Sequence, residues 1–310
     1  MPLVNTKKMF DDAYQNGYAV GAFNVDSIAM IQSLLQAAQD LQSPVIISIS
    51  KGSRNFMHPG NIKDMVECVS KHITIPYAIH LDHGDSFEVC KQCIDEGFTS
   101  VMIDCGDDAT FEERIALTKQ VVDYAHAHGA TVEGELGELG GEDGNKAHHG
   151  FSSPQMVREF VLRTGVDCLA VSVGTGHGLK KFADISSSTL EFDLIKQMMQ
   201  LLPGFPFVLH GSSSINNQNL QDFNQYGGNI HGAIGVPEEQ IRQAVKLGIC
   251  KVNIGTDFRV AYVGALRKSL AQNPSRFEPR TFLQPAKQAV YNLVYHKIEN
   301  VFGSKGHGIY

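Results

Sequence analysis

The sequence predicts an α/β protein folded as a single (β/α)8 barrel, the TIM-barrel class, with an extra C-terminal helix. Eight short apolar runs alternate with eight segments of helical periodicity along the 310 residues, and such alternation gives a parallel sheet wrapped by helices. No Gly-x-Gly-x-x-Gly follows the first strand, which argues against an open dinucleotide-binding sheet. The length suits one large barrel, and no linker-like stretch divides the chain, so we expect one domain over residues 1–310.

The elements can be placed from apolar spacing, caps and breakers. The predicted strands are residues 19–25, 44–50, 76–82, 100–105, 131–136, 167–173, 206–210 and 249–254. The predicted helices are residues 27–41, 61–72, 86–96, 111–128, 153–163, 188–202, 237–247 and 256–270. The C-terminal extension, about residues 274–310, adds a helix over 285–301. Three connections, residues 137–152, 174–187 and 216–237, are long enough to be binding loops or lids.

Composition excludes several classes of protein. The net charge of −7 and the lack of a basic stripe argue against nucleic-acid binding. No apolar run is long enough to cross a membrane, and the first residues do not form a signal peptide. Six scattered cysteines suit reduced thiols and predict a cytoplasmic protein. Cys90 and Cys93 have redox spacing, but they fall inside a predicted helix without the usual Gly or Pro context.

Polar side chains end every predicted strand. A barrel gathers these ends on one face, where active sites of this fold lie. Residues 79–84 read IHLDHG; Asp82 and His83 are adjacent and point to opposite sides of a regular strand, so one could bind a metal while the other faces a substrate. The strand-end residues are Asn24, Ser50, Asp82, His83, Asp104, Glu133, Glu135, His177, His210 and Asn253.

Two kinds of ligand are indicated at this face. Three histidines from different strands, His83, His177 and His210, are typical of a catalytic zinc site that leaves one position open. The carboxylates Asp104 and Glu135 could hold a second metal or an alternate position of the first. Glycine-rich turns after strands six, seven and eight, together with a nearby lysine, favour a phosphate site.

Motifs along nearly the whole chain resemble those of the class II, metal-dependent ketose-bisphosphate aldolases. They are HLDHG, GFTSVMID, VEGELGELGG, GTGHG, LHGSSS, KVNIGTD and FEPR. The insertion over residues 226–237, YGGNIHGAIGVP, resembles most closely the fructose-1,6-bisphosphate aldolase branch. The resemblance implies a glycolytic carbon–carbon lyase with a catalytic zinc ion, a second divalent or monovalent cation, a sugar bisphosphate substrate, and a homodimer or homotetramer.

The resemblance also implies a role for each matching residue. His83, His177 and His210 would bind the zinc ion, Asp82 would be the acid/base at the C4 hydroxyl, and Asn253 would hold the enediolate. The C1 phosphate would be held by Gly178, Lys181, Gly211, Ser213 and Thr256. The aldehyde end would be lined by Asn24 and Ser50, and the C6 phosphate would meet Arg259 and the Arg280 of a neighbouring subunit. The acidic loop would supply a proton-transfer carboxylate.

The chain departs from the family pattern at two places. Its acidic loop is one residue shorter than is common, so either Glu142 or Asp143 could transfer the proton. Position 255 is glycine where fructose-bisphosphate aldolases usually carry Asp or Asn, which leaves open a tagatose-1,6-bisphosphate aldolase or another ketose-1-phosphate aldolase.

Three other readings compete with a metal-dependent aldolase. A Schiff-base aldolase would use Lys251, which lies one layer below the strand end. A metallohydrolase barrel usually begins with His-x-His on strand one, which is absent here. A sugar-phosphate sensor without activity is disfavoured by the intact Asp82 and three histidines.

Overall fold

Eight parallel strands form a closed barrel in which each strand pairs with its neighbours in sequence and β1 pairs with β8. The computed structural model describes residues 2–106, 108–137, 153–176 and 189–308. The strands are β1 (Val20–Asn24), β2 (Val45–Ser50), β3 (Tyr77–Gly84), β4 (Ser100–Ile103), β5 (Thr131–Leu136), β6 (Cys168–Val171), β7 (Phe207–Leu209) and β8 (Ile249–Ile254). The predicted (β/α)8 barrel is confirmed.

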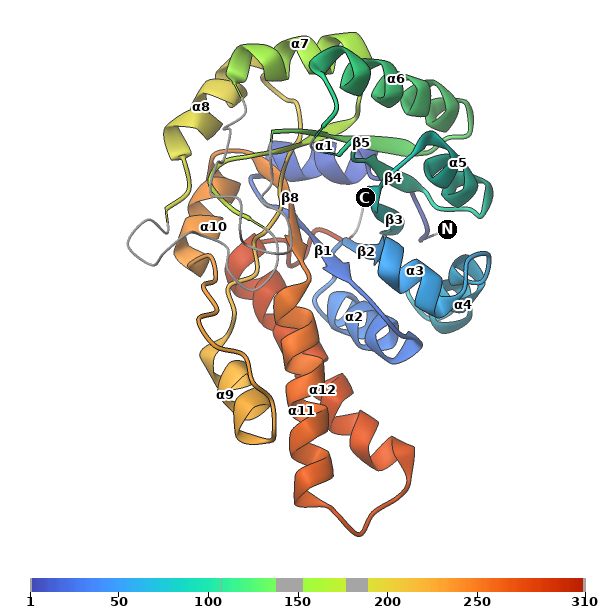
Figure 1. Ribbon diagram of the computed structural model, residues 1–310, viewed down its shortest axis with the longest axis vertical. Coiled ribbons are helices and arrows are strands. Elements are labelled where there is room, and N and C mark those ends of the chain that lie inside the picture. Colours follow the sequence, from blue (N-terminus) through green and yellow to red (C-terminus); the bar gives the residue numbers. More distant parts are fainter. Residues whose placement is uncertain (1, 107, 138–152, 177–188, 309–310) are drawn as a thin grey trace.

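Helices surround the barrel (Figure 1). They are α1 (Lys7–Asn16), α2 (Ile28–Asp40), α3 (Lys51–Met57), α4 (Ile62–Val69), α5 (Phe87–Asp95), α6 (Phe111–Ala127), α7 (Pro154–Thr164), α8 (Phe192–Leu201), α9 (Asn217–Gln225), α10 (Glu238–Lys246), α11 (Thr256–Gln272) and α12 (Pro279–Lys297), followed by a π-helix, Ile298–Phe302. The sequence analysis missed α1, which precedes the first strand, and α3 and α9, which are additional helices in the connections after β2 and β7. None of the described helices has the length and apolar character needed to cross a membrane.

Local sequence signals explain where several helices begin. Side chains of Ser27, Ser50 and Ser86 accept hydrogen bonds from backbone N–H groups three residues ahead, which satisfies donors that the helix leaves unpaired. The prediction that the last helix begins at residue 285 is wrong, because α12 already begins at Pro279. It tolerates Pro285 in its interior: the carbonyl of Thr281, which loses its usual N–H partner, accepts from the Ser269 hydroxyl at 3.4 Å.

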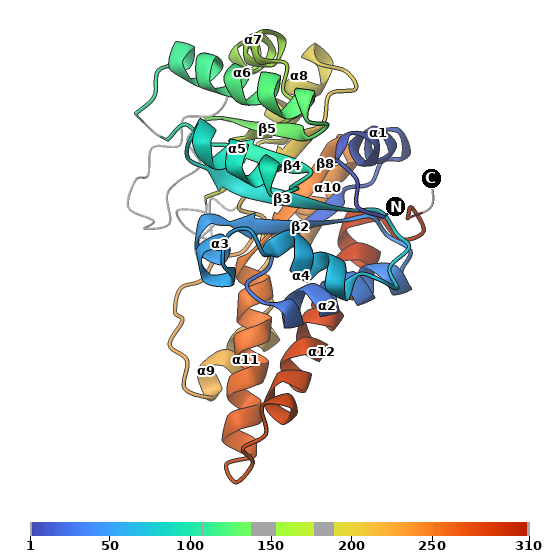
Figure 2. The same cartoon turned by 90° about the vertical axis from the view of Figure 1, so that its right-hand side faces the viewer.

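Two apolar cores hold the barrel together. The larger core lies between the strands and the outer helices. The smaller core fills the part of the barrel interior nearest α1, which we call the lower half, with mostly small side chains. Met9 and Phe10 of α1 close this end. Figure 2 shows α1 at one end of the strands and α3 at the other. Chemistry is therefore confined to the end that α1 does not cover.

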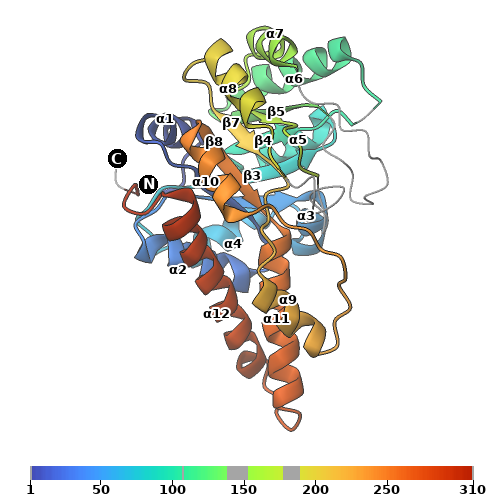
Figure 3. The ribbon, with the colours of Figure 1, turned by 90° about the vertical axis from the view of Figure 1, so that its left-hand side faces the viewer.

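Two helices extend beyond the barrel. α11 and α12 pack against each other and project away from the strands, with α9 packed on α11 (Figures 1 and 3). The inner half of α12 packs on α2. The loop at the outer end of this pair exposes Phe277, 88% of whose surface is accessible.

Candidate active site

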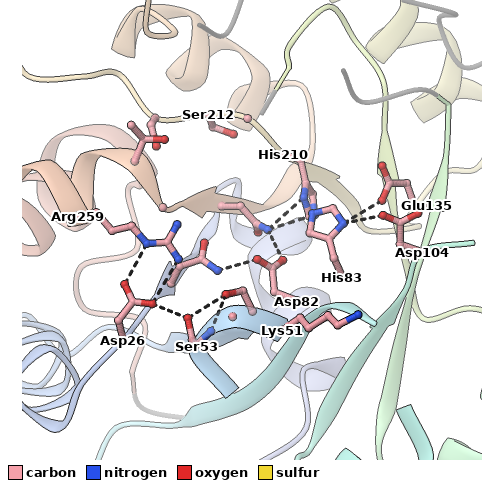
Figure 4. A pocket seen from close by; sticks show the side chains of 18 of the residues that line it. Asp26, Lys51, Ser53, Asp82, His83, Asp104, Glu135, His210, Ser212 and Arg259 are labelled. Carbon is pink, nitrogen blue, oxygen red and sulfur yellow. Dashed lines mark hydrogen bonds and ion pairs between the residues drawn. The ribbon is translucent and has the colours of Figure 1, made fainter. Parts of the chain in front are cut away.

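A cavity of about 960 Å³ lies at the carboxyl ends of the strands (Figure 4). Residues from most strand ends and from α3 and α11 line it, with polar and charged side chains predominating. Thirteen predicted site residues meet there: Asn24, Ser50, Asp82, His83, Asp104, Glu135, His210, Gly211, Ser213, Asn253, Gly255, Thr256 and Arg259. This volume is large enough for a small phosphorylated ligand.

An irregularity in β3 turns two adjacent side chains into this cavity. The register between β3 and β4 shifts between Leu81 and Gly84, and His83 has a φ of 54°. A left-handed backbone is unusual outside glycine and marks a locally strained position. Gly84 is needed because a Cβ there would lie 2.7 Å from the carbonyl oxygen of Met102. Asp82 and His83 therefore both face the cavity, which a regular strand would not allow.

The Asp82 carboxylate is held between two amides. Asn24 Nδ2 donates to Oδ2 at 2.6 Å, and Asn253 Nδ2 donates to Oδ1 at 3.2 Å. Burial alone would raise the pKa of Asp82, but the charges of the neighbouring histidines and of Lys251 outweigh it and hold this pKa below its ordinary value. Asp82 is thus an ionised, oriented carboxylate at neutral pH, as a general base must be.

Two overlapping groups of side chains have the composition of a metal site. Asp82, His83 and His210 place ligand atoms within 4.8 Å of one another, as do His83, Asp104 and Glu135. His83 Nδ1 lies 3.0 Å from Asp104 Oδ2 and 3.5 Å from Glu135 Oε2. Burial disfavours the imidazolium, yet the hydrogen bond to Asp104 and the close carboxylate of Glu135 raise the pKa of His83 well above 6.5.

The carboxylates around His83 therefore favour a positive charge at this point. Glu135 is buried, its Oε2 has no hydrogen-bond partner among the described residues, and burial raises its pKa. An imidazole pair with nearby carboxylates is a donor set that divalent metals accept. The residues present fit a metal ion, and His177, the third predicted ligand, lies outside the described residues.

The turn after β7 contains residues of the predicted phosphate site, and its geometry is described by the structure. Gly211 has a φ of 62°, and a Cβ there would lie 2.3 Å from the carbonyl oxygen of Gly176. Asp257 on α11 accepts from the backbone N–H groups of Ser214 and Ile215 at 2.8 and 2.5 Å. This holds the turn, while the side chains of Ser213 and Thr256 line the cavity beside the N-terminus of α11, a favourable place for an anion.

The mouth of the cavity contains charged residues that the sequence analysis did not identify. Asp26 accepts from Arg259 Nε at 3.0 Å and from the Ser53 hydroxyl, which also contacts Ser50 (Figure 4). Lys51 pairs with Asp85. Because these side chains follow the strand ends by one or more residues, a search restricted to each last strand residue misses them.

Six predicted site residues do not join the cavity of this chain. Gly178, Lys181, Glu142 and Asp143 lie outside the described residues, as does His177. Arg280 lies at the start of α12, pairs with Glu278 at 3.1 Å and is not among the residues that line the cavity. Its contact with a substrate held by a neighbouring subunit stays a prediction.

Cys90 and Cys93, the two cysteines with redox spacing, do not line this cavity. Cys90 and Cys93 are free, fully buried and packed in the outer core. Burial raises the pKa of Cys93 to about 12, so its reactive thiolate form is scarce at neutral pH.

Comparisons with known proteins agree with this geometry. The family model described as fructose-bisphosphate aldolase class-II matches residues 4–230 and 229–307. A fructose-bisphosphate aldolase of Giardia intestinalis is 43% identical over 99% of this chain and 95% of its own length, and one of Treponema pallidum is 40% identical over 98% and 97%. The crystal structure of the YdjI aldolase of Escherichia coli K12 superposes with a TM-score of 0.80 at 30% identity, covering 99% of this chain and all of that one.

Proposed function

Since the chain belongs to the class II fructose-bisphosphate aldolase family, we propose that it reversibly cleaves D-fructose 1,6-bisphosphate into dihydroxyacetone phosphate and glyceraldehyde 3-phosphate. The observation that carries this proposal is the Asp82 carboxylate, held by two amides next to the metal-type donor set. A base, a cation site and a phosphate cradle in one cavity are what a retro-aldol reaction on a phosphorylated ketose requires.

Asp82 begins the cleavage by accepting the proton of the substrate's C4 hydroxyl. The C3–C4 bond then breaks, C4 becomes the aldehyde carbon of glyceraldehyde 3-phosphate, and the electron pair forms an enediolate on C2 and C3. Asn253, whose amide already contacts Asp82, donates a hydrogen bond to the developing oxyanion. One carboxylate of the acidic loop, Glu142 or Asp143, returns a proton to C3 and completes dihydroxyacetone phosphate.

His83 and His210, together with His177, would hold the catalytic metal ion, which we propose to be zinc. When bound, such an ion supplies a Lewis acid next to the oxygen that becomes negative, a contribution of several kcal/mol. Asp104 and Glu135 would hold a second divalent or a monovalent cation, or an alternate position of the first.

The two phosphates fix the substrate across the cavity. Gly211, Ser213 and Thr256 would bind the C1 phosphate with Gly178 and Lys181. Asn24 and Ser50 would line the aldehyde end, where Arg259 meets the C6 phosphate. Arg280 from a neighbouring subunit would complete this end in a homodimer or homotetramer. Holding both ends of the substrate directs binding energy into orienting the reacting carbons.

A coupled assay with fructose 1,6-bisphosphate tests the proposed function. We expect turnover that a chelator abolishes and that zinc or cobalt restores. Full activity of the metal-free protein would overturn the histidine metal site, and absence of turnover with any ketose bisphosphate would overturn the aldolase assignment. Borohydride with substrate present should not inactivate the enzyme, because no Schiff base forms.

One observation supports a second substrate. Gly255 lines the cavity with no side chain, and a Cβ built on it would lie 3.0 Å from Asn24 Oδ1 and 3.8 Å from Arg259 Nη1. A carboxylate or amide at this position could hydrogen-bond the sugar near C4, which glycine cannot do. We therefore propose that tagatose 1,6-bisphosphate, the C4 epimer, is also cleaved.

A further inference from the structure

A buried lysine lies inside the barrel, directly below the active site and without contact to the cavity. Lys251 on β8 is 0% exposed, and its Nζ donates to Glu133 Oε2 at 2.6 Å. Glu133 on β5, also 0% exposed, accepts from His210 Nε2 at 2.7 Å through its other oxygen, Oε1. His80 completes the group, with its Nε2 3.3 Å from Lys251 Nζ and its Nδ1 2.8 Å from Ser100 Oγ.

We propose that Glu133 and Lys251 are positioning residues that prepare His210 for metal binding, an inference that rests on the proposed function. In a neutral imidazole one ring nitrogen carries the proton and the other offers a lone pair. A carboxylate against Nε2 places the proton there. The Nδ1 lone pair of His210, 3.4 Å from the Asn253 amide nitrogen, then becomes the ligand for a metal ion. Partners of this kind orient metal-binding histidines and contribute about 10–100-fold in metal affinity.

Lys251 compensates the buried negative charge of Glu133. A carboxylate with no solvent exposure is strongly destabilising unless a buried opposite charge and hydrogen bonds compensate it. Lys251 supplies that charge to the oxygen that His210 does not use. The Lys251 ammonium also contacts His80, and each oxygen of the Glu133 carboxylate has its own partner, Oε1 with His210 and Oε2 with Lys251. These contacts hold the carboxylate against His210.

The same geometry excludes Lys251 as a Schiff-base lysine. Its Nζ is enclosed by Glu133 and His80, and the residue does not line the cavity. A carbonyl substrate would have to enter the packed interior of the barrel to reach it.

Metal affinity of the variants tests the proposal. Glu133→Gln keeps the length of its side chain and Lys251→Met shortens it by one atom, and each variant removes one charge. Competition against a chromogenic chelator should show zinc and cobalt bound about 10–100-fold more weakly in both variants than in the wild type. The absorption spectrum of bound cobalt should also change, because the ligand His210 is no longer held. Arg54→Met is the matched control: it breaks the largely buried pair of Arg54 with Glu96 at 3.1 Å and should leave metal affinity unchanged.

The double variant Glu133→Gln with Lys251→Met separates positioning from folding. Removing both charges leaves no unpaired buried ion, so the melting temperature should recover relative to Lys251→Met alone. Metal affinity should stay low. Recovery of affinity together with stability would overturn the proposal, as would wild-type affinity and cobalt spectrum in Glu133→Gln. These measurements use no substrate, so failure of the proposed function appears separately, as a wild-type protein that binds metal but does not cleave ketose bisphosphates.

Discussion

The two halves of the barrel interior are built on the same strands but have opposite chemistry. On β3 the inward positions change from Ala78 in the lower apolar core to His80 and Asp82 above it, and Val208 on β7 is followed in the same way by His210 just after the strand. The lower half is sealed by α1, whereas the upper half opens into the cavity. Two residues along a strand are enough to pass from packing to chemistry, because alternate residues of a strand face the same side.

This difference teaches that stability and activity can be perturbed separately in this molecule. The lower half contributes hydrophobic burial, and the upper half buries charges that cost stability unless they are paired. Substitutions in one half should therefore affect one property much more than the other.

Asp82→Ala removes the proposed base from the upper half of the barrel and should have the largest effect on activity. We expect kcat to fall about 10²–10⁴-fold, because general acid–base groups contribute that much. Metal content, measured by elemental analysis, should be retained. Loss of the metal together with activity would make Asp82 a ligand or a structural residue instead.

Phe10→Ala removes a large side chain from the apolar core of the lower half. Phe10 is 1% exposed, and its removal should lower the free energy of unfolding by about 3–5 kcal/mol. Urea unfolding measures this change, while kcat of the folded protein should stay at the wild-type value. Phe56→Ala is the control, since Phe56 is 78% exposed and its loss should change stability by no more than about 0.5 kcal/mol. A large fall in kcat for Phe10→Ala would show that the two halves are coupled.

Gly255→Asp tests how the upper half discriminates between substrates that differ at C4. The wild type should cleave fructose and tagatose bisphosphates with kcat/KM values within about 10²-fold, as expected of a pocket that discriminates by shape. The new carboxylate should favour one epimer by a larger factor, at some loss of rate because Asn24 must shift. A wild-type preference above roughly 10³-fold for fructose bisphosphate that the variant leaves unchanged would place the selectivity elsewhere.

Thiol labelling probes how tightly the lower half is closed. Cys68 is exposed and should react rapidly with a disulfide reagent. Cys250 lies in the lower core, and burial raises its pKa to about 12, so it should react only after unfolding. The rate at Cys250, followed by mass spectrometry, should increase in Phe10→Ala. Rapid labelling of Cys250 in the wild type would mean that α1 does not seal the barrel.

Most of the fold follows from sequence periodicity, since all eight strands lie where apolar runs predict them. The elements that were missed depend on one local feature and one tertiary contact. α3 begins directly after β2, where Ser50 both ends the strand and caps the helix. α12 continues through Pro285, and the carbonyl of Thr281 that this proline leaves without its N–H partner accepts from Ser269 of α11, a tertiary contact that no local pattern reveals.

The sequence predicts which residues gather at the candidate site, but it does not predict how they contact one another. The strand-end rule gathers Asp82, His83 and His210 correctly. It does not predict that His83 turns inward, which depends on a register shift against β4. It also does not predict the pairing of Lys251 with Glu133, because that contact joins residues 118 positions apart across the barrel.

Closure of the barrel between β1 and β8 has a consequence for how the protein is made. Asn24 and Asn253, the two amides on Asp82, come from these first and last strands, and Val20 pairs with Lys251. During synthesis the chain emerges from its N-terminal end at about 5–20 residues per second. Until β8 follows, β1 and β7 keep open edges that invite pairing with other chains. We therefore expect the nascent chain to depend on protection from aggregation until nearly all of it has left the ribosome, and the base to acquire its second amide only then.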